Sequence, residues 1–444
     1  MPPVESEAYA EERRMAERKI LVVGGGGREH TLAWKLANDR GNPRVYCAPG
    51  NAGTAQVARN LDIPATDIEA LVKWALAERP HLAVIGPEAP LCEGIVDRFA
   101  AAGLRAFGPS RAAAQLEGSK AFAKEIMQAA GVPTAKAARF SDAGEAKAYL
   151  RKQGAPVVVK ADGLAAGKGV TVAATVSEAE AAVDASLVKG EFGEAGRTVL
   201  VEECLQGEEA SILALVDGRN IVPLASAQDH KRVFEKDEGP NTGGMGAYSP
   251  APVVQDRWWP FIRREVLEKT VAELTRRGIV YKGVLYAGLM MTADGPKVLE
   301  FNCRFGDPET QVVIPRLACD LLPALDACVD GTLSENLLRW KNDACACVVM
   351  AAGGYPGSYA KGDEITGLEA AGALEDVIVF HAGTAQRDGK VVTAGGRVLG
   401  VTGLGADLQA ALGRAYEACG RIGFKNAHFR RDIGWRALQE RNRT

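Results

Sequence analysis

The chain has 444 residues, of which 47% are hydrophobic, so it is long enough for about three domains with their own cores. Its net charge of −3 gives no basic footprint for nucleic acid or an anionic membrane, and no stretch resembles a membrane span. We therefore expect small molecules as partners, with no nucleic acid and no membrane, and nine cysteines without framework spacing indicate reduced thiols.

The first segment, residues 1–18, mixes acidic and basic side chains. It lacks the apolar run of a signal peptide, which favours a cytoplasmic protein. We interpret this segment as a disordered extension.

A strand, a glycine turn and a helix are predicted next. The turn contains four consecutive glycines, 24 to 27, whose backbone N–H groups can approach an anion at the helix N-terminus. This order is typical of a doubly wound α/β domain with a parallel sheet. A dinucleotide site is the alternative, but Glu29 stands where its third glycine belongs, and the strand at 44–48 ends without the acid that binds ribose. A smaller phosphorylated ligand, gripped by this loop and Arg28, fits better.

Another strand, predicted at 82–85, ends in the turn Gly86-Pro87-Glu88. Because the carboxyl ends of parallel strands meet at one edge of a sheet, the three strand ends are expected to line one crevice. Ser119 is then expected to cap a helix that stops at Gly131, and Ser141 a second helix after a short strand at 135–140.

A second glycine-rich loop joins two β-branched strands, predicted at 157–160 and 170–173. The loop contains Gly163, Gly167, Lys168 and Gly169. Such a loop can cover a phosphate with amide donors and a cation, while Lys160, at the end of the incoming strand, supplies a fixed positive charge. The Walker order of residues is absent, and a plain glycine-rich hairpin remains the alternative.

Acidic residues follow the strand predicted at 198–201 and precede the one at 210–216. Glu202, Glu203 and Glu209 suit ribose hydroxyls, and the backbone beside them can hydrogen-bond a base. Solvated surface charge is the alternative.

A stretch with little apolar content extends from 228 to 250. It supplies cations, His230, Lys231 and Arg232, and glycines that allow close approach to a substrate, Gly243, Gly244 and Gly246. Long ordered loops are usually functional, so we predict a substrate loop here, with an ordinary surface loop as the alternative.

The most informative stretch is 298–311, which follows a predicted helix at 257–277 and lies at the end of a predicted hairpin. Glu300 and Asn302 share one face of the strand, because strand side chains repeat every two residues. Their oxygens suit Mg²⁺, which keeps its other positions for water and phosphate. Arg304 and Asp307 follow closely, although a charged turn after an edge strand is the alternative.

A third domain is expected from about residue 345 onward. Its Cys345 and Cys347 lie in an apolar run without a second pair nearby, so we predict buried thiols and no metal site. No nucleophile constellation is visible in it.

Together these segments resemble the ATP-grasp superfamily and, within it, the phosphoribosylamine–glycine ligase family. The resemblance extends from Lys19 to about Glu440, and its most specific motif is R-F-G-D-P-E-T-Q at 304–311. The other motifs are G-G-R-E-H at 26–30, A-P-G-N-A-G-T at 48–54, G-P-E-A-P-L at 86–91, K-A-D-G-L-A-A-G-K-G-V at 160–170, Q-D-H-K-R at 228–232 and G-P-N-T-G-G-M-G-A-Y-S-P at 239–250.

The resemblance implies α/β and α+β domains in a fixed order. Residues 19–121 would form the doubly wound domain that binds phosphoribosylamine, 122–330 the ATP-grasp domain with a mobile glycine-rich lid at about 135–205, and 331–444 an α+β C-terminal domain. A single ligase unit of this length resembles the monofunctional bacterial form, and we expect a monomer.

The implied activity is the ATP-dependent joining of glycine to 5-phosphoribosylamine in purine biosynthesis, through a glycyl phosphate, with Mg²⁺ or Mn²⁺ on Glu300 and Asn302. By resemblance, ATP would contact Lys120, Lys160, Gly163, Gly167, Lys168, Gly169, Glu202, Glu203, Leu205 and Glu209. Catalytic roles would fall to Arg304, Asp307, Asp229 and Lys160. The substrates would contact Gly27, Arg28, Glu29, Asn51, Gly86, Glu88, Lys231, Asn241, Gly243, Gly244, Met245 and Arg304.

There are two alternatives to this activity, and the second belongs to a different class of protein. The first is a different ATP-grasp ligase, such as a carboxylase component that handles bicarbonate, although the motif at 304–311 speaks against it. The second is a nucleotide-binding regulatory module without catalysis, for which the metal ligands or phosphate lysines should be missing.

Overall fold

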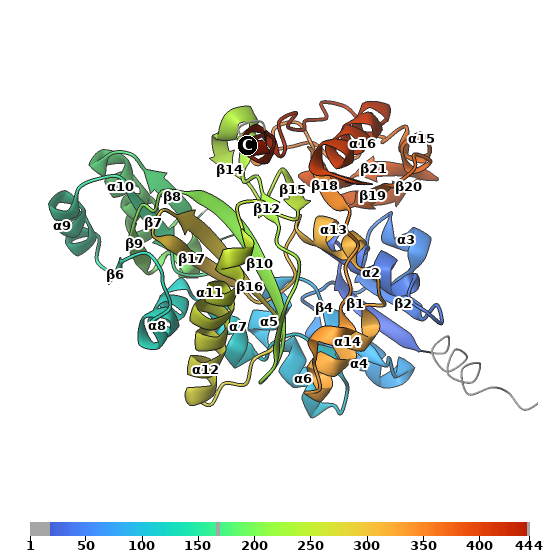
Figure 1. Ribbon diagram of the computed structural model, residues 1–444, viewed down its shortest axis with the longest axis horizontal. Helices are drawn as coiled ribbons and strands as arrows, with labels where there is room; N and C mark the ends of the chain where they lie inside the picture. The colour runs from blue at the N-terminus through green and yellow to red at the C-terminus, as the bar shows by residue number, and fades with distance from the viewer. Residues whose placement is uncertain (1–17, 166–168, 442–444) are drawn as a thin grey trace, which may run out of the picture.

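The computed structural model describes residues 18–165 and 169–441 (Figure 1). The predicted extension at 1–17 lies outside these residues, as do Gly167 and Lys168 of the second glycine loop. Within the described part, none of the helices combines the length and apolar content needed to cross a bilayer.

The N-terminal domain contains a five-stranded parallel sheet, which confirms the doubly wound prediction. Both faces are covered, because Ile20 and Val22 point into one hydrophobic core while Leu21 and Val23 point into another. The strand order is β3 (Arg59–Asn60), β2 (Arg44–Pro49), β1 (Lys19–Gly24), β4 (Leu82–Ile85) and β5 (Ala106–Phe107). The helices are α2 (Gly27–Ala37), α3 (Thr54–Val57), α4 (Ile68–Glu78), α5 (Glu88–Glu93), α6 (Ile95–Ala101) and α7 (Arg111–Gly118).

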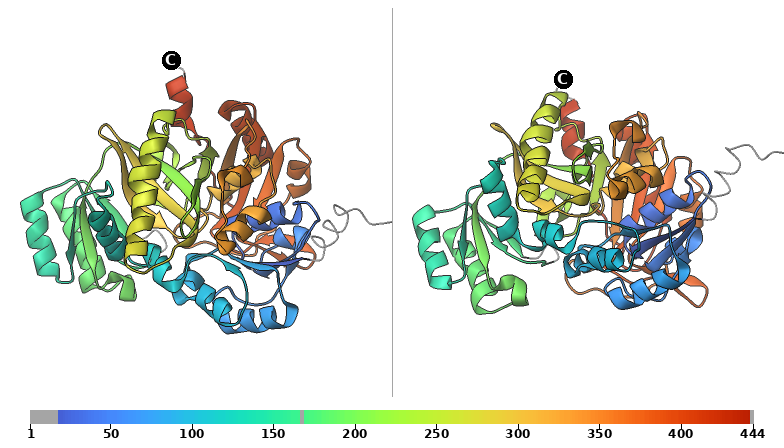
Figure 2. Two further views of the ribbon diagram at one scale, coloured as in Figure 1. Left: turned by 60° about the horizontal axis from the view of Figure 1, so that its bottom comes forward. Right: turned by 90° about the horizontal axis from the view of Figure 1, so that it is seen from below.

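The segment predicted to be the lid, called the lid below, contains a four-stranded antiparallel sheet that stands to one side of the molecule (Figure 2). Its strands are β6 (Ala137–Phe140), β9 (Val199–Glu203), β7 (Val157–Ala161) and β8 (Val170–Ala173), and its helices α9 (Ala143–Gln153) and α10 (Val176–Val183). The predicted cap of α9 was wrong by one residue. Asp142, not Ser141, accepts the hydrogen bond from Glu145 N, because a carboxylate caps as well as a hydroxyl.

The central sheet has the order β11 (Ile221–Pro223), β10 (Glu208–Asp217), β16 (Lys282–Thr292) and β17 (Gly295–Asn302). Helix α8 (Lys120–Ala130) packs against α12 (Lys269–Arg276). As predicted, Ser119 caps α8 and Gly131 ends it in the left-handed conformation. The long helix predicted at 257–277 contains a π-helical segment at Ile262–Glu268, in which Ile262, Val266 and Leu267 are buried.

The C-terminal sheet has the order β12 (Gln228–Asp229), β15 (Gly246–Ser249), β18 (Ala344–Ala351), β22 (Arg397–Gly405) and β19 (Val377–His381). Helix α16 (Leu408–Arg421) packs on β22 and β18, and α15 (Leu368–Gly372) lies beside it. Two of these strands come from the stretch that we predicted to be a loop. That prediction was wrong for Gly246–Ser249, which is completely buried because β18 pairs with it. Cys345 and Cys347 are buried free thiols, as predicted.

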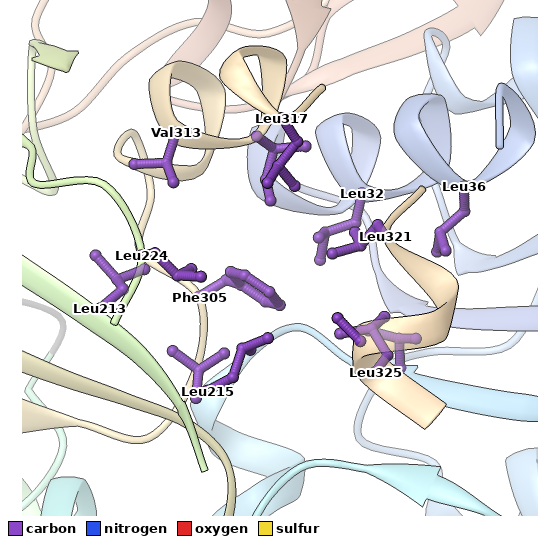
Figure 3. Packing of buried hydrophobic residues seen from close by; sticks show 14 of the residues in the cluster. Leu32, Leu36, Leu213, Leu215, Leu224, Phe305, Val313, Leu317, Leu321 and Leu325 are labelled. Carbon is purple, nitrogen blue, oxygen red and sulfur yellow. The ribbon is translucent and has the colours of Figure 1, made fainter. Parts of the chain in front are cut away.

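One hydrophobic core joins the N-terminal domain, the central sheet and the segment after β17 (Figure 3). Phe305 lies between Leu213 and Leu215 of β10 and Leu325 of α14 (Leu322–Asp330), and its ring stacks on Phe107 of β5 at 6.1 Å between centroids. Its burial fixes where the residues before and after it can lie. The short helix α13 (Thr310–Val313) follows.

Replacing Phe305 by alanine should lower the free energy of unfolding by about 3–5 kcal/mol, the usual cost of removing a buried phenylalanine ring. The side chain is 1% exposed, whereas Phe234 is 51% exposed and serves as the control. Urea unfolding of Phe305→Ala and Phe234→Ala measures the difference. Equal losses would contradict the role of Phe305 in joining the domains.

Candidate active site

Arg304 lies two residues after the end of β17 and meets acidic residues of α5 and α7. Its Nη2 lies 2.9 Å from Glu117 Oε1, and its Nε lies 3.4 Å from Glu88 Oε2. Burial opposes the charge on Arg304, but Glu117 and Glu88 outweigh it and raise its pKa. Burial likewise raises the pKa of Glu88, but Arg304 and Arg28 outweigh it, so the net pKa is lowered. This is a partly buried ionic centre that joins the N-terminal domain to the central sheet.

The first glycine loop is organised by Glu29. Its Oε2 accepts from Gly26 N at 2.6 Å, and its Oε1 accepts from Arg28 Nε at 2.5 Å. A Cβ on Gly24 would lie 2.6 Å from the Glu29 side chain, and Gly86 also faces that carboxylate. Glu29 therefore fills the place of the third glycine of a dinucleotide motif. Arg28 Nη1 donates to Phe305 O at 3.1 Å, which connects the loop to residues 304–311, called the signature segment below.

Asn51 connects the loop to the C-terminal domain. Its Nδ2 donates to Gly25 O at 2.9 Å and to His381 O at 2.8 Å, while its Oδ1 accepts from Gly53 N and Thr54 N. The Asn51 side-chain amide therefore makes its hydrogen bonds within the protein.

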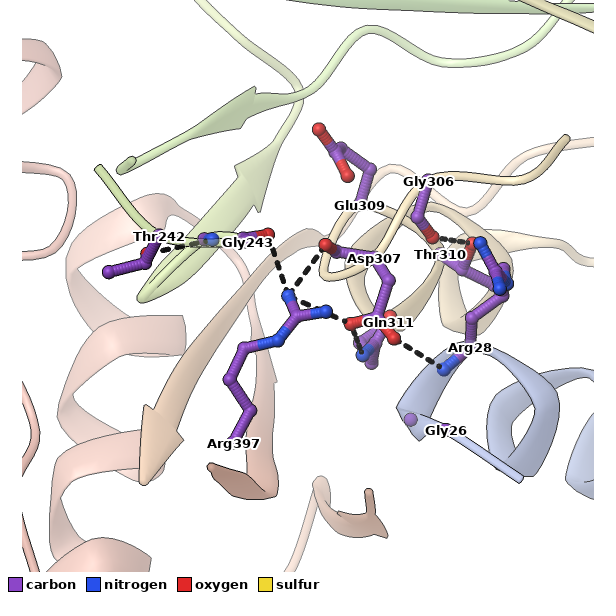
Figure 4. A network of polar contacts seen from close by, with 12 residues as sticks. Gly26, Arg28, Thr242, Gly243, Gly306, Asp307, Glu309, Thr310, Gln311 and Arg397 are labelled. Atoms are coloured by element: carbon purple, nitrogen blue, oxygen red, sulfur yellow. Dashed lines mark hydrogen bonds and ion pairs between the residues drawn. The ribbon is translucent and has the colours of Figure 1, made fainter. Parts of the chain in front are cut away.

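Asp307 lies at the junction of three segments (Figure 4). Its Oδ2 accepts from Arg28 N at 3.3 Å, its Oδ1 accepts from Gln311 Nε2 at 2.9 Å, and Arg397 Nη1 lies 3.3 Å from Oδ1. Burial raises the pKa of Asp307, but Arg397 and Arg28 outweigh it, so the carboxylate stays ionised. Arg397 Nη1 also donates to Gly243 O at 2.6 Å and to Asp307 O at 2.7 Å.

The predicted substrate loop is pressed against this junction. Gly244 has φ +113°, and a Cβ there would lie 2.5 Å from Pro308 Cδ, so glycine is required. Gly243 N donates to Tyr355 Oη at 3.1 Å. Asn241 is half-buried and pairs with Arg232, whereas Met245 is fully buried in a small core with Val233. The backbone of this loop therefore faces the site, and the Met245 side chain does not.

The central sheet contributes charges of both signs. Lys231 Nζ lies 2.7 Å from Glu209 Oε2 and 3.8 Å from Glu300 Oε1. Burial raises the pKa of Glu300, but Lys231, Lys160 and Lys120 outweigh it and keep the carboxylate ionised. Burial raises the pKa of Asp229 to about 8, against the attraction of Lys231. Glu300 and Asn302 alternate with the buried Phe301, so both side chains point away from the core.

The lid places Lys160 beside this strand. Its Nζ donates to Leu299 O at 2.9 Å and lies 2.9 Å from Glu202 Oε2, while Lys124 Nζ lies 3.2 Å from Glu202 Oε1. Glu202 thus lies inside β9 as the partner of two buried lysines. Lys120 Nζ donates to Gly163 O at 2.9 Å.

The remaining predicted nucleotide residues flank this centre. Glu203 Oε1 accepts from Lys136 N at 3.1 Å, Leu205 is half-buried in the segment after β9, and Gly169 adjoins β8. A Cβ on Gly169 would crowd Ala165 and Ala161. The glycine loop is therefore closely packed at both of its described ends.

Three family models match successive parts of the chain, all described as phosphoribosylglycinamide synthetase: the N domain at residues 18–117, the ATP-grasp (A) domain at 118–310 and the C domain at 345–436. The chain belongs to the phosphoribosylglycinamide synthetase family. A phosphoribosylamine–glycine ligase from Nostoc sp. is 54% identical over 428 residues, covering 94% of this chain and 99% of the relative. One from Escherichia coli O157:H7 is 52% identical over 425 residues, covering 95% and 99%.

Solved structures agree with this assignment. The family member from Thermotoga maritima, a phosphoribosylamine–glycine ligase, has a TM-score of 0.83 at 34% identity and covers 94% of this chain and 100% of its own. The biotin carboxylase domain of 2-oxoglutarate carboxylase from Hydrogenobacter thermophilus has a TM-score of 0.71 at 17% identity, covering 93% and 91%. The second likeness shows a shared fold alone.

Two residues of the ionic network were not predicted from the sequence. Glu117 ends helix α7, and Arg397 begins β22 after a glycine turn. A single charged residue at the end of an element is ordinary on a protein surface, so neither carried a local signal. Only the fold brings Glu117 to Arg304 and Arg397 to Asp307.

A pair of buried histidines holds the first glycine loop against the C-terminal domain. His30 Nδ1 accepts from His381 N at 2.8 Å, and the rings are 5.6 Å apart. Burial, and then the neighbouring His381, lower the pKa of His30 to about 3, and burial lowers that of His381 to about 4. Both rings are therefore neutral in the folded protein at physiological pH.

Acid should consequently destabilise the fold. The unfolded chain binds protons near the usual histidine pKa of about 6.5, whereas the folded protein does not, so the stabilisation is present above pH 6.5 and lost as pH falls toward 4. Each histidine contributes up to about 1.4 kcal/mol per pH unit in that range. His381→Gln should flatten the dependence of the free energy of unfolding on pH, and His428→Gln, outside the pair, is the control. An unchanged slope in His381→Gln would contradict this assignment.

Proposed function

We propose that this chain joins glycine to 5-phosphoribosylamine at the expense of ATP, giving glycinamide ribonucleotide, ADP and phosphate. The observation that carries this proposal is the meeting of the first glycine loop, the signature segment and the charged face of the central sheet around Arg304, in a chain of the phosphoribosylglycinamide synthetase family. Three kinds of anion, a sugar phosphate, a carboxylate and a polyphosphate, can be held there at once.

The reaction needs an activated carboxylate. In the first step a glycine carboxylate oxygen attacks the γ-phosphorus of ATP, and ADP leaves. In the second step the amine of phosphoribosylamine attacks the carbonyl carbon of glycyl phosphate, and phosphate leaves with the oxygen that glycine supplied. Positioning and charge neutralisation carry most of the catalysis in such transfers, so a protein nucleophile is not required.

The phosphates of ATP are assigned to the lysines between lid and central sheet. Lys120 donates to Gly163 O, and Lys160 lies on β7, the strand that leads into the loop. The loop residues assigned to the phosphates are Gly163, Gly167, Lys168 and Gly169. The adenosine is assigned to the segment after β9, with Glu202, Glu203, Leu205 and Glu209. Lys160 exchanges Glu202 for phosphate when the nucleotide binds.

A divalent cation fits beside Glu300 and Asn302. Both ligands are hard oxygen donors, and the ionised Glu300 remains partly exposed, so it is accessible to a cation that arrives with the nucleotide. Among the described residues no three His, Cys, Asp or Glu side chains form a metal cluster, and a site that shares its metal with phosphates needs fewer protein ligands. Mg²⁺ or Mn²⁺ would neutralise phosphate charge there.

The amine acceptor is assigned to the N-terminal domain, with its phosphate on Gly27 and Arg28 and its ribose near Asn51, Gly86 and Glu88. Glu29 shapes this loop from within. Arg304, Asp307 and Asp229 are assigned to glycine and the acyl phosphate, and the loop with Asn241, Gly243, Gly244 and Met245, together with Lys231, closes the site. The chain is proposed to act as a cytoplasmic monomer.

Lys160→Ala should lower kcat by about 10²–10³-fold, the usual cost of removing one preorganised charge-stabilising donor. Lys147→Ala is the matched control, because Lys147 is also a lid lysine in an ion pair, with Asp184 at 2.6 Å, and lies outside the site. Steady-state ADP formation measures both. Turnover of Lys160→Ala within threefold of the unaltered protein would reject its assignment.

The proposed activity is tested by ADP release with ATP, glycine and phosphoribosylamine generated in place. ADP and phosphate should form in equal amounts, and only when both acceptor substrates are present. Bicarbonate replacing glycine would instead support the carboxylase alternative. ADP formation that ignores glycine, or release of AMP and pyrophosphate, would overturn the proposal.

A further inference from the structure

Arg430 is a buried cation that the proposed chemistry does not use. Its side chain is 0% exposed, and its guanidinium forms a bidentate pair with Asp432, Nε to Oδ1 at 2.8 Å and Nη2 to Oδ2 at 2.9 Å. Its Nη1 lies 2.8 Å from Asp237 Oδ1 and donates to Arg232 O at 3.1 Å. Asp237 and Arg232 lie almost 200 residues earlier in the chain, so Arg430 ties two distant segments together.

Those earlier residues form the exposed hairpin of β13 (Arg232–Phe234) and β14 (Glu238–Asn241). The segment 430–436, which we call the C-terminal strap, contacts its turn at two further points. Arg436 Nη2 donates to Asp237 Oδ2 at 2.7 Å, and Lys236 N donates to Asp432 Oδ2 at 2.7 Å. The last two residues of the strap begin helix α17 (Trp435–Arg441), which lies beside β14 in Figure 1.

The turn that the strap holds is strained. Lys236 has φ 56° and Asp237 has φ 58°, so two adjacent non-glycine residues adopt the left-handed conformation. Such residues persist only where their surroundings over-determine them, and they gather at sites where geometry matters to function. The ion pairs on Asp237 and the hydrogen bond from Lys236 N supply that constraint.

Both ends of the hairpin run into the active site. Strand β13 begins directly after Lys231, whose Nζ pairs with Glu209, and β14 leads into the loop with Gly243 and Gly244. The two ends are joined by hydrogen bonds from Thr242 N to Lys231 O and from Met245 N to His230 O, each 2.7 Å. The strap also reaches this point, because Gly434 N donates to His230 Nε2 at 3.1 Å.

We propose that the C-terminal strap positions the substrate loop, with Arg430 as its central positioning residue. The hairpin connects the strap to the site. Arg430 holds the turn of the hairpin in place. The turn then determines where the backbone of Gly243 and Gly244 packs against the segment that contains Asp307. This inference rests on the proposed function, because it assigns that loop to glycine and the amine acceptor. The nucleotide lysines Lys120 and Lys160 belong to other elements and do not depend on the strap.

The test compares Arg430→Met with Arg414→Met. Arg414 forms an ion pair in the same domain, 2.9 Å from Asp376, and is more exposed than Arg430, so it controls for the loss of an arginine charge away from the hairpin. In Arg430→Met, kcat/KM for glycine should fall about 10- to 100-fold, the scale expected when a distant change misplaces a positioned substrate. The Kd for ATP should stay within twofold, and Arg430→Lys, which restores the charge without the fork, should recover part of the loss.

Hydrogen exchange provides a readout that does not need turnover. The amides of Lys236 and Thr242 should exchange at least tenfold faster in Arg430→Met than in Arg414→Met. Should Arg430→Met fail to fold, Asp237→Asn removes the same contact from the half-buried side of the pair. Unchanged exchange, or faster exchange with unchanged kcat/KM for glycine, overturns the proposal.

Different results would contradict the proposed function and the strap proposal. If the unaltered protein shows no glycine-dependent ADP release, the proposed function fails, and the strap proposal with it. If the unaltered protein is active and Arg430→Met keeps its kcat/KM for glycine, the strap proposal alone fails. An equal rise in the Kd for ATP and the KM for glycine would likewise reject positioning, because general loosening of the fold would explain it.

Discussion

The site depends on one constraint: charges that are removed from water must have partners. Arg304 lies between Glu117 and Glu88, Arg28 against Glu29, and Arg397 against Asp307, and in each of these pairs the burial of one member is offset by the other. Arg304 and Arg397 find those partners in other domains, so the ionic network also fixes how the domains meet.

The same constraint suits a ligase that brings three anions together. A phosphate or carboxylate entering the site can replace a protein carboxylate beside a cation without creating an unpaired charge. Lys160 illustrates this, because its ammonium contacts Glu202 and Leu299 O, and it lies on β7, the strand that leads into the loop proposed for ATP phosphates. The buried thiols offer no competing chemistry, since burial raises the pKa of Cys347 to about 12 and keeps it neutral.

Much of the fold was predictable because local signals agreed with the final packing. The strands at 82–85 and 170–173 have the predicted bounds, since a glycine ends the first apolar run and a glycine precedes the second. The alternation of residues 300–302 correctly predicted that Glu300 and Asn302 share one face of the strand, because Phe301 between them is buried on the other face. These features depend on residues that are neighbours in the sequence.

What could not be predicted depends on residues far apart in the chain. Gly246–Ser249 became a buried strand only because β18 pairs with it about 100 residues later, and glycines hid its pattern. Glu117 and Arg397 have partners in other domains, and Arg430, besides its local pair with Asp432, has a partner in a distant hairpin. Gly167 and Lys168, predicted to cover the phosphates, lie outside the described residues.

The central claim is that the substrates' own groups perform the chemistry while the protein positions them. The most direct measurement uses glycine labelled with ¹⁸O in its carboxylate and follows the label by mass spectrometry of the released phosphate. Attack of the glycine oxygen on ATP predicts one labelled oxygen in each phosphate formed. Unlabelled phosphate from a fully labelled glycine would contradict a glycyl phosphate and point to a phosphorylated protein side chain or to hydrolysis by water.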